Sequence, residues 1–220
     1  MSELKLAVAK KISEYVAGGG FMFAMCSATD TYDIALAAEG TDICAAVFDG
    51  DPIDPNCNSK LNYAKTFAFK DFSVITEPSI YEHSSIDNGE YAGRRVIPEQ
   101  DYFTLFDFSA KWDPVPTMLT QCHTRTVKGF MGQATAFQKK YIKPNALNMG
   151  ENKPAGESRY IHGTYGYGFW TYYGGHDPED YRHYVGDPPT DLNLHPNSPG
   201  YRLILNNILF PAAKKKHQKT

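Results

Sequence analysis

The chain has 220 residues, of which 42% are hydrophobic and 14% aromatic, so a single domain of this length can bury its own core without disulfide bonds. The formal net charge of -3 argues against a nucleic-acid partner, which requires clustered Lys and Arg. No apolar run reaches the roughly 18 residues that span a bilayer, and residues 1–20 do not resemble a secretory signal. Four cysteines without CxxC spacing are expected to be free thiols. We therefore expect one soluble domain over residues 1–220, cytoplasmic by default, with no nucleic-acid or membrane partner.

The first predicted elements are a helix, a strand and a second helix. Apolar residues recur at helical spacing between Leu4 and Val16, and three glycines at 18–20 end this helix. The continuous apolar run at 21–25 predicts a strand covered on both faces, as in a parallel sheet. Helix-capping residue types and another apolar run then predict a helix that reaches Gly40.

The middle of the chain carries weaker signals. A turn-rich surface loop is expected at 49–56, and the polar, irregular stretch 77–100 is interpreted as an insertion. A helix is expected at 126–140. Short apolar runs predict further strands at 43–48, 67–69, 73–76, 102–108 and 117–120.

The last third of the chain predicts a hairpin and a helix. Strands at 160–163 and 169–173 flank a glycine-rich turn, and the second strand leads into Gly174, Gly175 and His176. Ser198 as cap and Pro199 at the first helical position begin a buried C-terminal helix. The basic tail at 214–220 is expected to lie in solvent.

Cys26 and His176 are the best candidates for catalysis. Cys26 lies between a buried strand and a helix, where a tight turn exposes a nucleophile and the helix N-terminus is expected to lower the pKa of the thiol. The backbone N–H of Ser27 would form half of an oxyanion hole. His176 follows a strand, at the edge where open α/β sheets bind ligands, and Glu179 or Asp177 could orient its ring. The alternatives are a Cys26 that packs as a small hydrophobe and a His176 that belongs to an ordinary loop.

Three further residues are candidates for substrate binding. His123 and Arg125 could point into the same cleft to hold an anionic or amide group, although they would also suit an ordinary loop. Tyr173 belongs to a cluster of tyrosines near His176 that is compatible with an aromatic pocket, or with core packing.

Metal and cofactor sites are only weakly indicated. His176, Asp180 and His183 would line one face of a helix with zinc-binding groups, but Pro178 makes that helix doubtful. The aspartates at 49–56 lack the spacing of an EF-hand. No glycine-rich phosphate loop occurs, so we expect no metal and no cofactor.

Residues 15–20, before the Cys26 strand, and residues 166–176 resemble the class I glutamine amidotransferase-like superfamily, particularly its ThuA-like (trehalose utilisation) branch. Cys26 and His176 match the nucleophile elbow and the histidine of that family. The family's acid two positions after the histidine is replaced by Pro178, so the resemblance implies an acid on either side of this proline. More narrowly, residues 177–181 and 194–201 resemble bacterial proteins labelled asparagine synthetase B.

The resemblance implies a flavodoxin-like three-layer α/β sandwich with a mostly parallel sheet. It also implies that the chain is the C-terminal portion of the full domain, with a missing N-terminal half or a second copy as partner. The function expected is that of a Cys–His hydrolase or amidotransferase acting on a small amide or ester. The rival is a non-catalytic domain of the same fold that binds a carbohydrate or metabolite.

Overall fold

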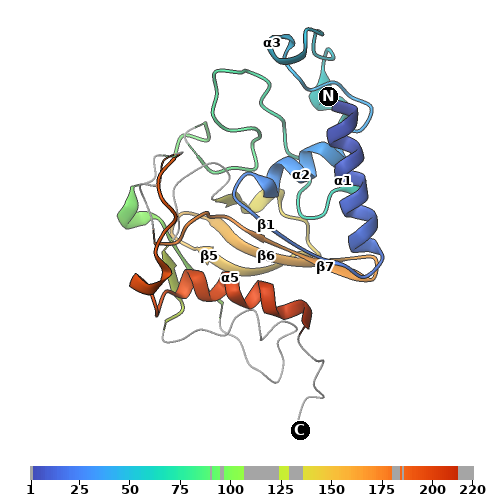
Figure 1. Ribbon diagram of the computed structural model, residues 1–220. Helices are drawn as coiled ribbons and strands as arrows, with labels where there is room; N and C mark the ends of the chain where they lie inside the picture. The colour runs from blue at the N-terminus through green and yellow to red at the C-terminus, as the bar shows by residue number, and fades with distance from the viewer. Residues whose placement is uncertain are drawn as a thin grey trace.

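The computed structural model describes residues 2–89, 91–94, 97–106, 124–128, 136–179, 184 and 186–212. In these residues a curled, half-barrel sheet of seven strands has the order β1-β7-β6-β5-β2-β3, with β4 paired to β6. Helices α1 and α2 cover one face of the sheet and helix α5 covers the other (Figure 1). The strands are β1 (Phe21–Met25), β2 (Tyr102–Leu105), β3 (Thr126–Lys128), β4 (Phe137–Gln138), β5 (Leu147–Asn152), β6 (Glu157–Tyr165) and β7 (Gly168–Tyr173). The helices are α1 (Ser2–Ala17), α2 (Ala28–Ala37), α3 (Ala46–Asp49) and α5 (Pro199–Leu209), and short 3-10 turns lie at 57–60, 63–65, 98–100, 139–141, 192–194 and 210–212.

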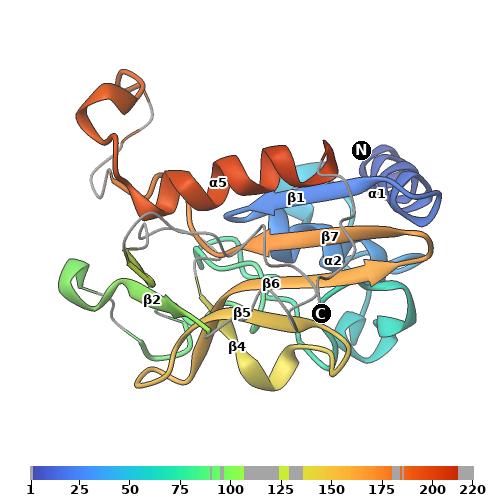
Figure 2. The same ribbon diagram turned by 90° about the horizontal axis from the view of Figure 1, so that it is seen from below.

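The direction of the strands overturns the expected flavodoxin-like sandwich. Only β1 and β7 pair in parallel, whereas all the other described pairings are antiparallel. Figure 2 shows β1, β7, β6, β5 and β2 in succession across the sheet. The apolar run in β1 correctly indicates coverage on both faces, but it carries no information on the direction of neighbouring strands. Direction is set by the connections, and the short connections between β5, β6 and β7 allow only antiparallel neighbours.

The strongest local patterns are confirmed. The structure contains α1, β1, α2, the β6–β7 hairpin and α5 close to the expected bounds. Ser198 caps α5 by accepting a hydrogen bond from the Tyr201 N–H. The close approach of β7 to the end of α1 requires Gly168, because an added Cβ would lie 2.1 Å from the backbone carbonyl oxygen of Val16.

Several weaker predictions are wrong. Residues 46–49 form a short helix instead of part of a strand, and the expected strands at 67–69 and 73–76 are single β-bridges, to Ile142 and Ser84. The described parts of 126–140 are β3, β4 and a 3-10 turn instead of a helix. Short apolar runs have no period long enough to separate helix from strand, so distant partners decide their conformation. The expected strand at 117–120 lies outside the described residues.

The core lies on both faces of the sheet. One cluster packs α1 and α2 on the sheet, and a second packs Leu203 of α5 against β2, β3, β5, β6 and β7. Helix α5 is buried on one side only, because Ile208 on its outer side is 64% exposed. The stretch 77–100 is irregular where described, yet Ser84, Ile86 and Asp87 are buried. No helix in the described ranges is long and apolar enough to cross a membrane.

Candidate active site at the carboxyl end of β1

Cys26 occupies a strained turn between β1 and α2. Its φ is 53°, in the left-handed region that residues other than glycine rarely adopt. The Cys26 N–H donates to the Tyr173 carbonyl at 3.2 Å, and the Cys26 carbonyl accepts from the Thr29 N–H at 3.1 Å and the Thr29 hydroxyl at 2.7 Å. The expected tight turn is therefore present, and neighbouring groups hold it on both sides.

The expected lowering of the Cys26 pKa is wrong. Burial raises the pKa of the thiol, and the nearby acids Asp30 and Asp87 raise it further. Hydrogen bonds from the backbone and side chain of Ser27 lower it by less. The favourable field of the helix N-terminus is thus outweighed by desolvation and by two acids. At neutral pH Cys26 therefore keeps its thiol proton.

Asp30, in the first turn of α2, lies close to Cys26 and belongs to the helix-capping residue types from which the start of this helix was predicted. Its carboxyl is fully buried and accepts from the Thr31 N–H at 2.8 Å and the Ser84 hydroxyl at 3.3 Å. Burial first, and Asp87 second, raise the pKa of Asp30 to about 8. Asp30 is therefore mainly protonated at pH 7. An acid four residues after the candidate nucleophile was the available signal.

His176 and its neighbouring acids lie at the same edge of the sheet. Met25 pairs with Tyr173, so the chain leaves β7 beside Cys26 and reaches His176 three residues later, where the side chain is exposed. The structure thus brings the segments that carry Cys26 and His176 to one edge.

The two acids expected to orient His176 have other partners. Asp177 accepts from the hydroxyls of Thr190 and Tyr201 and from the Glu179 N–H at 3.2 Å. Glu179 Oε2 lies 3.7 Å from His195 Nδ1.

The candidate substrate-binding residues are dispersed. His123 lies outside the described residues, and Arg125 is exposed just before β3. Tyr173 is fully buried and packs with Tyr160 and Phe103. Trp170 and Tyr172 are equally buried, so these rings near His176 build the core instead of an aromatic pocket.

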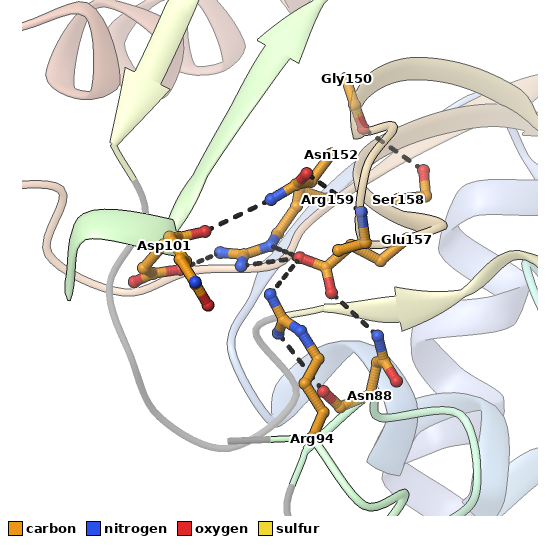
Figure 3. A network of polar contacts seen from close by, with 10 residues as sticks. Asn88, Arg94, Asp101, Gly150, Asn152, Glu157, Ser158 and Arg159 are labelled. Atoms are coloured by element: carbon orange, nitrogen blue, oxygen red, sulfur yellow. Dashed lines mark hydrogen bonds and ion pairs between the residues drawn. The ribbon is translucent and has the colours of Figure 1, made fainter. Parts of the chain in front are cut away.

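A buried ion network continues the site along the same edge (Figure 3). Arg159 of β6 is fully buried and pairs with Asp101 and, at 2.9 Å, with Glu157. Arg94 binds the same Glu157 oxygen at 2.9 Å, and Asn88 donates to the other oxygen at 2.9 Å. Two cations and two anions balance one another here, as buried charges require.

Asp87 connects this network electrostatically to Cys26 and Asp30. It acts on the pKa of Arg94 on one side and on those of Asp30 and Cys26 on the other. No local pattern predicts the network, because its members come from two distant stretches of the chain, 88–101 and 157–159. The available signal was a pair of charged residues, Glu157 and Arg159, directly before the strand expected at 160–163.

The described residues contain no group of three or more His, Cys, Asp and Glu side chains that could hold a metal ion. Asp180 and His183, which belong to the zinc alternative, lie outside the described residues.

Comparisons of the chain with protein-family models, curated proteins and solved structures find no match. The arrangement of the site therefore carries the functional argument.

Proposed function

We propose that the chain is a cysteine-dependent hydrolase or amidotransferase that acts on a small amide or ester, with Cys26 as nucleophile and His176 as general base. The supporting observation is the left-handed Cys26 between β1 and α2, because backbone strain in a non-glycine residue gathers at functional sites. The same turn leaves Cys26 partly exposed, and Cys26 follows the strand that pairs with the end of β7, from which the chain leads to His176.

The proposed reaction follows from the protonation state of the thiol. The sulfur of Cys26 attacks the carbonyl carbon of the substrate while the thiol proton moves to His176. The bond from that carbon to the amine or alcohol then breaks, and the leaving group takes the proton from His176. Water then attacks the thioester carbon, His176 passes the proton of that water to the Cys26 sulfur, and the acyl group leaves as a carboxylic acid. In an amidotransferase, the ammonia released in the first step is the group passed to an acceptor. Of the two acids, we favour Asp177 as the group that orients His176, since Glu179 lies beside His195.

The test is the pH dependence of iodoacetamide alkylation at Cys26, followed by mass spectrometry of peptides. We expect His176→Ala to slow alkylation near pH 7 by about tenfold or more, because a positioned base contributes at least that much to proton transfer. Cys44, also partly exposed and with a pKa raised by burial, is an internal control whose rate should not change. A Cys26 that does not react in the folded protein would contradict the proposal.

A non-catalytic ligand-binding domain is the second candidate. It is favoured by the raised pKa of Cys26 and by the other partners of Asp177 and Glu179. This candidate predicts that a small ligand, found by a thermal-shift screen of amides, sugars and amino acids, stabilises the Cys26→Ala variant as much as the original chain. Loss of stabilisation in the variant would count against it.

A further inference from the structure

A single carbonyl oxygen joins the two halves of the proposed site. The Tyr173 carbonyl accepts from the Cys26 N–H at 3.2 Å and from the Gly175 N–H at 3.1 Å. The end of β1 and the segment leading to His176 are therefore held at the same atom. A shift of Tyr173 would move the two segments relative to each other.

The side chain of Tyr173 supports the same segment. A Cβ added to Gly175 would lie 3.0 Å from Cζ and 3.2 Å from the hydroxyl oxygen of Tyr173. The backbone of Gly175 thus rests directly against the phenol ring. The preceding residue is also held, because the Gly174 N–H donates to the Arg159 carbonyl at 2.6 Å.

The ring is itself held by its surroundings. It packs edge-on against Phe103, with ring centroids 5.9 Å apart, and against Tyr160 at 6.2 Å. Arg159 and Asp101 both act on the pKa of the phenol, which burial raises, so Tyr173 lies in the field of the ion network.

The Tyr173 hydroxyl has no hydrogen-bond partner in the described part of the chain, and neither has Oδ2 of Asp101. A buried phenol oxygen without a partner is unfavourable for folding alone. The ring therefore acts on its neighbours through its packing against Gly175 and not through a hydrogen bond of its hydroxyl to the described residues.

We propose that Tyr173 and Gly175 are positioning residues. The ring of Tyr173 supports the backbone of Gly175, and this support fixes the course of the chain so that His176 lies near Cys26. This inference rests on the proposed function, since it assigns the residues that align its base. Tyr173 acts through the backbone and does not contact the substrate.

The experiment compares the pH profile of Cys26 alkylation in Gly175→Ala and His176→Ala. The new methyl group must displace the ring of Tyr173, so Gly175→Ala should reproduce the loss of about tenfold or more at pH 7 expected for His176→Ala. Gly163→Ala is the matched control, because its Cβ would lie 2.3 Å from the ring of Trp170, which belongs to the core cluster that packs α1 and α2 and not to the cluster around Tyr173. This control should lose stability to urea while keeping the original pH profile.

A second pair of variants decides the question if Gly175→Ala does not fold. Tyr173→Phe keeps the ring and should keep the profile, whereas Tyr173→Leu removes the ring and should lose the His176-dependent rate. The inference alone is overturned if His176→Ala changes the profile while Gly175→Ala and Tyr173→Leu leave it intact. If His176→Ala itself changes nothing, the proposed function is wrong and the inference falls with it.

Discussion

Two acids on helix α2 show how differently the molecule treats buried carboxyl groups. Asp30 and Asp33 lie one turn apart, and both are fully buried. Asp33 accepts from three backbone N–H groups, those of residues 67–69, each at 2.8 Å, and from the Tyr172 hydroxyl at 3.2 Å. Asp30 receives one N–H at 2.8 Å and one hydroxyl at 3.3 Å, and it lies near the second acid Asp87. The two carboxyls share a helix but differ in their donors.

Because their donors differ, Asp33 has a structural role, whereas Asp30 belongs to the candidate site. Burial raises the pKa of Asp33 to about 6, because its donors and the nearby Lys143 offset much of the desolvation. The pKa of Asp30 is raised to about 8. Asp33 is thus a carboxylate at pH 7 that fastens the chain at 67–69 to α2. Asp30 keeps its proton next to Cys26.

The largest effect is expected from Asp33→Ala. This change leaves three buried backbone N–H groups without an acceptor, at about 1–3 kcal/mol each. We expect the free energy of unfolding to fall by about 3–6 kcal/mol, measured by urea unfolding at pH 7. Asp51→Ala in the exposed loop is the control and should change stability by less than about 0.5 kcal/mol. A loss below about 1 kcal/mol for Asp33→Ala would show that other groups fasten this loop.

A smaller effect, of the opposite sign, is expected from Asp30→Asn. The folded chain binds the Asp30 proton up to about pH 8, whereas the unfolded chain releases it near the ordinary aspartate pKa of 3.8. This residue therefore lowers stability as pH rises from about 4 to 8. Asparagine does not titrate. The free energy of unfolding of Asp30→Asn, relative to that of the original chain, should therefore rise by about 2–4 kcal/mol as the pH is raised from 4 to 8. Urea unfolding at both pH values measures this gain. A difference that does not depend on pH would refute the raised pKa of Asp30.

The smallest effect concerns the reactivity of Cys26. Asp30 is one of the acids that raise the pKa of this thiol, and its negative charge appears only as pH passes about 8. Asp30→Asn should therefore leave the alkylation rate unchanged at pH 6 and increase it a few-fold at pH 9. The rate of Cys44, whose pKa depends on Asp49 and Asp42, should be the same in both proteins. Equal alkylation rates of Cys26 in the two proteins at pH 9 would show that Asp30 does not act on this thiol.

The candidate site could be predicted only in part. The position of Cys26 between strand and helix and that of His176 after a strand follow from residues adjacent in sequence. The wrong pKa direction for Cys26 has a different origin, because its largest cause is burial in the folded chain, and Asp87, which adds to it, is about sixty positions away. Local sequence shows a helix N-terminus, but it does not show what is buried around it.

The sequence by itself determined α1, β1, α2, the β6–β7 hairpin and α5, because periodicity, caps and turn residues act over a few neighbouring positions. Only the tertiary structure decided the directions of the strands, the left-handed backbone of Cys26 and the protonated state of Asp30. It also decided the ion network, in which Arg159 meets Asp101 across 58 positions of the chain. The physical reason is that burial, charge pairing and sheet order arise between segments far apart in sequence, where no local pattern records the partner.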